Sequence, residues 1–471
     1  MAIAPTDIEA GTSGYDAVAT PKLQTNCTTQ ATCQLDDDAL PRRPDASIPK
    51  LMLLSLPSMA IPIAWSTQTV TSIAVTLPNY ALAQILMPIA TILTALTTGM
   101  FSDTSRATWG RRRPFLVAAS TLCIACLTLM GFTKDIGEAL GNSNNSDFFN
   151  GSRNNWTEFF CIFFWIWLAI TLAIMQITTS LLVADFAGER QVLGASISHG
   201  WNILGSLYVS RYISIVGYPL SSTHGYVAMA SIAVLTAVVV TCVAANESPK
   251  MDVENIRTLS SKLKSIVSGI VAFPGPLCVY GLVAFVLDYG NLVYNWSLFS
   301  FFQMELFGAG DCIGVGCDLS QDDFMKASNA LNDCSHWVFQ VVAYLLTWAF
   351  PFAIERFGAK RVVAAAIAPQ ALLVIVAFVT KPVIVTQIVV VLITLSHTLV
   401  FVLVVPLIVH LMGSSESDIG VYLGVMYTTN SLASLLHYIV KKSAGYESSS
   451  LEYKLPIFIG GLTAVVKMHA K

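Results

Sequence analysis

Long apolar stretches alternate with short polar breaks along the chain from residue 49 onward. A helix needs about 20 apolar residues to cross the hydrocarbon core of a bilayer, and it makes its backbone hydrogen bonds within its own segment, as a membrane interior requires. The pattern therefore predicts an all-α membrane protein with twelve spanning helices, at 51–75, 80–101, 115–133, 159–183, 195–217, 225–246, 275–299, 328–352, 362–380, 383–411, 418–440 and 455–470. The last stretch is short for a span, so either this helix is tilted and shallow or the C-terminus is truncated.

The composition agrees with this pattern, since 12% of the residues are charged, 54% are hydrophobic and the mean hydropathy is +0.64. Soluble domains average about a quarter charged residues, because their surface must be solvated. The net charge of −3 and the lack of a basic block do not indicate a nucleic-acid partner. The ten cysteines show no zinc or redox spacing, so we expect no metal and no cofactor.

Two polar stretches divide the chain into its expected parts. Residues 1–48 lack the apolar core that a cleavable signal peptide needs, and their composition predicts a disordered cytosolic tail. A basic stretch at 247–274 separates the sixth span from the seventh. The predicted organisation is a tail at 1–48, an N-terminal six-helix half at 49–246, a cytosolic linker at 247–274 and a C-terminal six-helix half at 275–471.

The distribution of Lys and Arg predicts which side of the membrane each loop faces. Most of these residues lie in segments that share a side with both chain ends. Basic loops stay in the cytosol, so we expect both termini there. The loop at 134–158, on the other side, carries three glycosylation sequons, at Asn144, Asn150 and Asn155. Three sequons in one outer loop indicate a glycoprotein of the eukaryotic secretory pathway.

Two cysteines, Cys312 and Cys317, lie in the long loop between spans 7 and 8. The predicted topology places this loop outside the cytosol, where a disulfide can persist. The sequence leaves open whether these two thiols are bridged or free.

The loop between spans 2 and 3 combines small, acidic and basic residues in a short distance. It contains Gly99, Asp103, Arg106, Gly110, Arg111, Arg112 and Arg113. Gly99 permits close helix approach, and Asp103 can pair with Arg106 or with the arginine cluster, forming a charged latch that holds one conformation of a rocking protein. Alternatively, the arginines only keep the loop in the cytosol. A less complete version of this loop pattern at 355–361, six spans later, indicates an internal repeat of two fused halves.

This loop resembles the signature between helices 2 and 3 of the major facilitator superfamily. Its extended form, Ser102-Asp103 followed by 110–115, is similar to that of the proton-coupled sucrose carriers of plants and their animal and fungal relatives. Further similar stretches lie at 135–141, 182–185, 202–205, 305–311 and 423–425. The resemblance implies two six-helix halves and proton-coupled symport of a sugar, a sucrose-like disaccharide or glucose, by alternating access.

The chain departs from that pattern at several positions, among them Ala433-Ser434, where these carriers have a Pro-Gln pair. Ser180 stands where these carriers have an arginine, Tyr427 where they have an asparagine, and Ser300 where they have an aspartate. Two alternatives therefore stay open: a sugar facilitator or organellar exporter without proton coupling, and a transport-dead receptor or scaffold of the same fold. A membrane enzyme is not indicated, because the chain has no HExxH, no GxSxG and no paired aspartate-rich motif.

Polar residues inside the predicted spans are candidates for substrate and proton binding, because ionisable groups in a membrane are costly and usually functional. Asp288, Asn291 and Asn295 are spaced i, i+3 and i+7, so they share one helix face. Carboxylate and amide groups hydrogen-bond hydroxyls, so this face is suited to a sugar, with Asp288 as the protonatable group. An interhelical hydrogen-bond network is the alternative interpretation.

The remaining candidates come from the resemblance or from single polar residues within spans. The resemblance implies that Asp135 and Asp185 are coupling or gating acids, although Asp185 could equally form a local ion pair with Arg190 at a helix end. Arg211 either snorkels outward or contacts the substrate. Trp65, Gln68 and Gln176 are candidate sugar ligands, and His199 and His397 are candidate proton carriers, each with a packing role as the alternative.

The expected partners are a small sugar, protons and membrane lipid. No sorting signal is evident, so we expect the plasma membrane, with a vacuolar or lysosomal membrane as the alternative. We expect a monomer.

Overall fold

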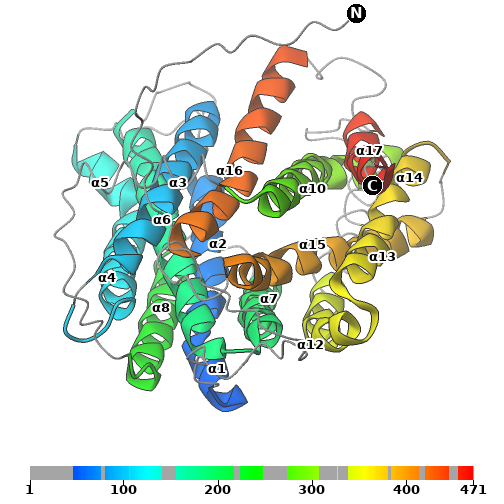
Figure 1. Ribbon diagram of the computed structural model, residues 1–471. Coiled ribbons are helices and arrows are strands. Elements are labelled where there is room, and N and C mark those ends of the chain that lie inside the picture. Colours follow the sequence, from blue (N-terminus) through cyan, green and yellow to red (C-terminus); the bar gives the residue numbers. More distant parts are fainter. Residues whose placement is uncertain are drawn as a thin grey trace, which may run out of the picture. The chain divides into compact units, whose positions relative to one another are not determined.

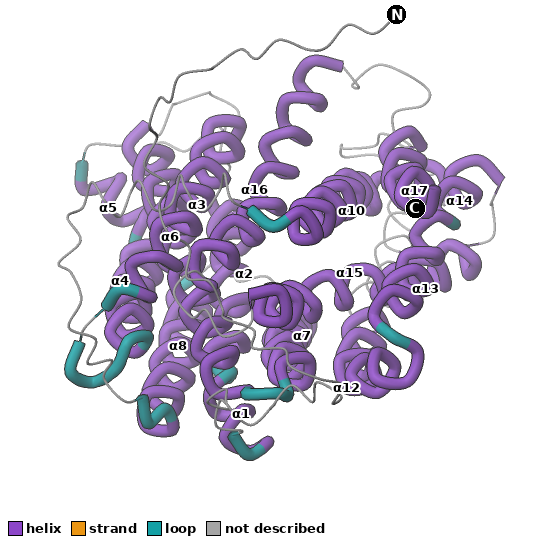
Figure 2. The backbone as a smooth tube through the Cα atoms, viewed as in Figure 1, coloured by secondary structure: helices purple, strands orange, loops and turns teal. Residues whose placement is uncertain are grey.

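The computed structural model describes residues 46–75, 80–105, 107–140, 155–216, 223–247, 273–306, 326, 338–379, 383–412, 419–444 and 454–469. Chain contacts separate the unit Met1–Pro41 from Arg42–Lys471, and everything described lies in the second unit. Within these ranges the secondary structure consists of helices joined by short turns, without strands (Figure 2). Most of the predicted tail and most of the predicted linker lie outside them.

Where the structure describes it, every predicted span falls on one helix or on two consecutive helices (Figure 1), and residues 328–337 of the predicted eighth span lie outside the described ranges. The helices before the linker are α1 (Ile48–Leu54), α2 (Pro57–Val75), α3 (Tyr80–Asp103), α4 (Arg113–Gly131), α5 (Thr133–Ala139), α6 (Asn155–Ala187), α7 (Gln191–Val216) and α8 (His224–Ala244). Those after it are α10 (Gly275–Ser300), which continues as the π-helix Phe301–Leu306, then α12 (Phe339–Phe357), α13 (Ala359–Ala371), α14 (Leu373–Val379), α15 (Val383–Met412), α16 (Ile419–Ala444) and α17 (Lys454–His469).

Nine of the helical stretches in the described ranges are long and apolar enough to cross a membrane. The stretches that fall short include α7, which carries His199, Asn202 and Arg211, and α17, a helix of 16 residues. Polar residues lower the hydropathy of α7 without shortening it. The described helices are consistent with the predicted twelve spans, and the weak twelfth span is a short helix, as the sequence indicated.

Each half has an apolar core of its own, and a further cluster joins the two halves. Residues of α2, α4, α6 and α8 form the first core, around Trp165 and Leu168, and residues of α10, α14, α15 and α17 form the second, around Phe302 and Val390. The cluster between the halves, here called the interface cluster, consists of Ala95, Ile177, Leu181, Ala184, Leu277, Val404, Val405, Ile408, Ile419, Tyr422, Leu423 and Met426. It packs the predicted cytosolic ends of α3, α6, α10, α15 and α16 together.

Glycines let α3 and α16 approach backbone to backbone. A Cβ atom at Gly99 would overlap the carbonyl of Gly420, and one at Gly424 would overlap the carbonyl oxygen of Ala95. The two helices consequently lie side by side (Figure 1). The contacts of Gly99 therefore agree with its predicted role in close helix approach.

The two related loops share a backbone feature. Gly110 has φ 120° just before the arginines at 111–113, and Gly358 has φ 80° just before Lys360 and Arg361. Left-handed φ values favour glycine, because a Cβ atom is strained there. This correspondence supports the predicted repeat, although the side chains at 355–361 are exposed.

Candidate functional site

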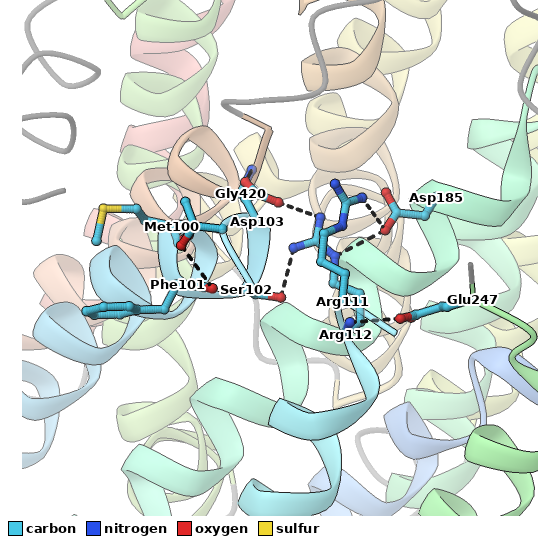
Figure 3. Close-up of polar contacts among 10 residues, drawn as sticks. Met100, Phe101, Ser102, Asp103, Arg111, Arg112, Asp185, Glu247 and Gly420 are labelled. Carbon is cyan, nitrogen blue, oxygen red and sulfur yellow. Dashed lines mark hydrogen bonds and ion pairs between the residues drawn. The ribbon is translucent and has the colours of Figure 1, made fainter. Parts of the chain in front are cut away.

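Arg112, the N-cap residue of α4, lies at the centre of a buried ion-pair network (Figure 3). Its guanidinium contacts the Asp103 carboxylate at 2.5 Å and the Asp185 carboxylate at 3.1 Å. It also donates a hydrogen bond of 2.8 Å to the Ser102 hydroxyl. Arg112 is 1% exposed. The end of α3, the end of α6 and the start of α4 are thus held by one buried side chain.

Neighbouring residues complete the network from two sides (Figure 3). Arg111 donates to Asp185 at 2.7 Å. Glu247, just beyond the end of α8, accepts a hydrogen bond of 2.9 Å from the backbone N–H of Arg112. A Cβ atom at Gly110 would overlap the Glu247 side chain. Gly110 is therefore required both for its left-handed φ and for the approach of Glu247.

Two guanidinium groups, of Arg111 and Arg112, face the carboxylates of Asp103 and Asp185. Burial opposes the positive charge of Arg112, but the carboxylates of Asp103 and Asp185 outweigh burial and raise its pKa above the ordinary arginine value. Breaking a buried ion pair by removing one partner costs about 3–5 kcal/mol, because the other charge is left uncompensated. Arg112 and its two carboxylates therefore act as a unit.

One hydrogen bond ties this network to the other half of the bundle. The Asp103 carboxylate accepts a 2.8 Å hydrogen bond from the backbone N–H of Gly420, in the first turn of α16 (Figure 3). Negative charge is favourable at a helix N-terminus, where N–H groups lack helical partners. We call Asp103, Arg111, Arg112, Asp185, Glu247 and Gly420 the latch.

The latch contains part of what the sequence predicted for this loop. Asp103 pairs with the arginine cluster, whereas Arg106 lies outside the described residues. Arg113 begins α4 and takes no part in the ion pairs found among the described residues. Asp185 contacts Arg111 and Arg112 rather than forming the alternative pair with Arg190.

A second polar site lies on α10. Asp288 and Asn291 are buried, and the Thr429 hydroxyl of α16 donates a 3.0 Å hydrogen bond to the Asp288 carboxylate. Asn295, two turns along from Asp288, is exposed. The face predicted from the spacing is therefore buried at Asp288 and Asn291 and open at Asn295.

Two contacts between the halves involve other polar residues of the predicted spans. Ser180 of α6 and Tyr427 of α16 share a 2.8 Å hydrogen bond. His199 of α7 stacks on Phe401 of α15, with ring centroids 5.5 Å apart, and Phe401 also contacts His397 at 5.2 Å. The Ser180–Tyr427 and His199–Phe401 contacts each connect helices that lie on opposite sides of the predicted linker, whereas His397 and Phe401 both belong to α15.

The other candidates are dispersed. Gln68 is buried within the N-terminal half, where its amide approaches the Trp165 carbonyl at 3.4 Å. Trp65 is 45% exposed, and Arg211 is exposed on α7. Asp135 is exposed in the first turn of α5, away from the latch end of α4.

Several predicted features lie outside the described residues: the sequons at Asn144 and Asn150, the side chain of Asn155, and Cys312 and Cys317. Sequence reasoning missed Glu247, Gly420, Thr429 and Phe401 as contact residues. Glu247 carried a signal, as an acid directly after an apolar span. A backbone donor such as Gly420 carries none, because its role depends on which helix ends meet.

No family model matches the chain. It is 29% identical to the sucrose transport protein SUT1 of Oryza sativa subsp. japonica over 141 residues, which is 30% of this chain and 24% of that protein. It is 29% identical to SUT4 of Oryza sativa subsp. indica over 166 residues, 34% of this chain and 28% of that protein. It is 32% identical to SUC3 of Arabidopsis thaliana over 105 residues, 22% and 18% of the two chains. The matched region thus spans about a quarter of these relatives.

Solved structures match over nearly the whole chain. The nucleoside transporter NupG has a TM-score of 0.55 at 14% identity, over 89% of this chain and 98% of its own. The proton:xylose symporter XylE of the major facilitator superfamily has a TM-score of 0.57 at 13% identity, over 89% and 93%. The chain has the major facilitator fold. A bacterial homologue of the iron transporter ferroportin, with a TM-score of 0.62 at 12% identity over 90% and 98%, also matches.

The major facilitator fold confirms the predicted all-α membrane architecture. The relatives and structures named here are transporters, which agrees with the prediction of a transport protein rather than a membrane enzyme. The resemblance to sucrose carriers that the loop motif predicted is confirmed by the sequence matches.

Proposed function

We propose that this protein is a secondary active transporter that carries a sugar together with protons by alternating access. The observation that carries the proposal is the latch, in which the Asp103 carboxylate joins a buried ion-pair network of one half to the N-terminus of α16 in the other. Such a contact between two halves can be made in one conformation and released in another.

The interface cluster supports the same mechanism. It packs apolar side chains of α3 and α6 against those of α10, α15 and α16 at the latch end of the bundle. Apolar packing and the latch together close this end, which the predicted topology assigns to the cytosol. A substrate site between the halves would then open to the other side in this conformation.

The sugar substrate is inferred from the relatives, which are sucrose transport proteins. The inner helices supply groups that suit hydroxyls: Asn291 and Asn295 on α10, Gln176 on α6, and Tyr427 on α16. A sucrose-like disaccharide is the first substrate to test, and glucose the second.

The proton is assigned to Asp288. This acid is buried within a membrane span, with the Thr429 hydroxyl as a hydrogen-bond donor. A buried membrane carboxyl group is a functional candidate by default, because an uncompensated charge there is costly. Asp288 would take up a proton on the outer side and release it on the cytosolic side.

A facilitator without proton coupling is the second candidate, and Ser180 favours it. Where the resemblance implies an arginine, this chain has a neutral serine that bonds to Tyr427. An arginine at this position would stabilise the charged form of a nearby carboxylate. The neutral pair of Ser180 and Tyr427 cannot do so.

Uptake by yeast that lacks its own sugar carriers tests the proposal at the plasma membrane. Labelled sucrose, maltose and glucose are offered at about pH 5 and pH 7.5, with and without an uncoupler. We expect uptake that is higher at acid pH and collapses with the uncoupler. Uptake that changes with neither the pH nor the uncoupler would indicate a facilitator. If the protein reaches the cell surface and takes up none of the three sugars, the proposal of a sugar carrier would be rejected.

A further inference from the structure

Tyr427 is in contact with a polar side chain of the opposite half. Its hydroxyl shares a 2.8 Å hydrogen bond with Ser180. Gln176 and Ser180 are four residues apart on α6, so they project from one face of that helix. One tyrosine of α16 is thus bonded to the face of α6 that also carries Gln176.

This contact lies directly beside the interface cluster. Ile177 and Leu181 of α6 and Leu423 and Met426 of α16 belong to that cluster, and the ring of Tyr427 packs against it. Tyr427 is seven residues from Gly420, or about 10 Å along α16 at 1.5 Å per residue. On α16, Tyr427 is therefore at the end of the cluster away from the latch, where a cavity between the halves would have its floor. On α6, Ser180 lies between the cluster residues Ile177 and Leu181.

The chemistry of the contact is neutral and exchangeable. A phenol, a serine hydroxyl and a primary amide each donate and accept hydrogen bonds. Hydroxyl groups of an uncharged polyol offer the same two functions, so they can replace Ser180 as the partner of Tyr427 without leaving a buried polar atom unsatisfied. A charged substrate would lack a counter-charge among these three residues.

We propose that Ser180 and Tyr427 form a gate at the floor of the substrate cavity, which opens when a hydroxyl-rich, uncharged substrate takes over the hydrogen bond that Ser180 makes to Tyr427. The gate rests on the proposed function and deepens it, because it names a recognition residue, Tyr427, in the C-terminal half. Ser180 keeps the halves together in the empty protein and does not bind the substrate.

The chain contains a matched control for this contact. Ser66 of α2 and Tyr226 of α8 also form a tyrosine–serine hydrogen bond, but both helices belong to the N-terminal half. Removing either hydroxyl there deletes the same chemical interaction without affecting the junction between the halves.

Hydrogen–deuterium exchange of the purified full-length protein tests the gate without any substrate. We expect Ser180→Ala and Tyr427→Phe to raise exchange several-fold at 95–105 and 419–426, the latch ends of α3 and α16. Ser66→Ala and Tyr226→Phe should leave exchange there at the wild-type level. Equal exchange at these segments in Ser180→Ala and the wild type would overturn the gate. Ser180→Ala is suited to this comparison because it removes only one oxygen atom.

Titration calorimetry with sucrose tests the recognition role separately. We expect Tyr427→Phe to weaken sucrose binding at least about tenfold, and Ser180→Ala to leave it unchanged or tighter, because the competing bond is gone. Unchanged binding by Tyr427→Phe would overturn the role of Tyr427. If the wild type neither binds nor transports any sugar, the proposed function fails, whereas the exchange comparison still decides whether the gate exists.

Discussion

The carboxylate of Asp103, at the end of α3, accepts a 2.8 Å hydrogen bond from the backbone N–H of Gly420, in the first turn of α16. The same α16 then meets the Ala95 backbone at Gly424 and the Ser180 hydroxyl at Tyr427. On its opposite side it reaches Asp288 through Thr429. One helix thereby connects the latch, the floor of the cavity and the proposed proton site.

Removing the side chain of Arg112 should both destabilise the protein and abolish transport. Arg112→Ala leaves the buried carboxylate of Asp103 without its 2.5 Å partner, a loss of about 3–5 kcal/mol for a broken buried ion pair. Arg112→Lys keeps the charge but not the guanidinium that reaches Asp103, Asp185 and Ser102 together, so we expect partial activity. Thermal unfolding in detergent and sugar uptake measure the two effects.

The matched control is Arg356→Ala, which removes an exposed arginine from the related loop at 355–361. Its unfolding temperature and its uptake should stay at the wild-type level. If Arg112→Ala unfolded at the same temperature as Arg356→Ala, the buried network would contribute nothing to stability.

Adding a single methyl group at Gly99 should block closure of the latch end. A Cβ atom at this position would overlap the Gly420 carbonyl, so Gly99→Ala pushes α3 and α16 apart. We expect uptake to fall at least about tenfold while the amount at the surface stays normal. Gly225→Ala on α8 is the control, since a Cβ atom there meets nothing within 4 Å. Equal uptake by the two variants would contradict the close approach of α3 and α16.

Replacing Asp288 by asparagine should uncouple uptake from pH. Asp288→Asn keeps the size and the hydrogen bond from Thr429 but cannot take up a proton. We expect uptake that no longer differs between about pH 5 and pH 7.5, or that is lost altogether. Thr429→Val removes the hydroxyl that bonds Asp288 and the Met426 carbonyl, each at 3.0 Å, and should keep the pH dependence. A wild-type pH profile in Asp288→Asn would assign the proton to another group.

The predicted topology can be tested by glycosylation of the loop at 134–158. Replacing Asn144, Asn150 and Asn155 together by glutamine should raise electrophoretic mobility, and glycosidase treatment of the wild type should produce the same shift. The sequon at Asn26 is the internal control, because a cytosolic tail is not glycosylated. Glycan at Asn26 would reverse the assigned orientation.

Much of the fold could be predicted because a membrane requires long apolar helices. The apolar stretches indicated α3, α4, α6, α8 and α15 directly, since each of these helices is long and apolar enough to span. The sequence indicated that Asp103 has a cationic partner close in the chain, and left open whether this partner is Arg106 or the arginine cluster, with which the structure pairs it.

The contacts between the halves could not be predicted from the sequence in the same way. Ser180 and Tyr427 are 247 residues apart, and each was notable only as a departure from the sucrose carriers. Their hydrogen bond depends on how α6 and α16 pack, which periodicity along one helix does not determine. The partner of Asp185 was likewise open, because Arg190 is near in sequence but Arg111 and Arg112 are near in space.

Sugar accumulation by proteoliposomes that contain only the purified protein tests the central claim most directly. Vesicles with an inside pH of about 7.5 are diluted into labelled sucrose at about pH 5.5, and the internal concentration is followed with and without a protonophore. The account predicts that sucrose rises several-fold above its external concentration and returns to the external level when the protonophore is added. Sucrose that never exceeds the external concentration, or that does not enter, would contradict it.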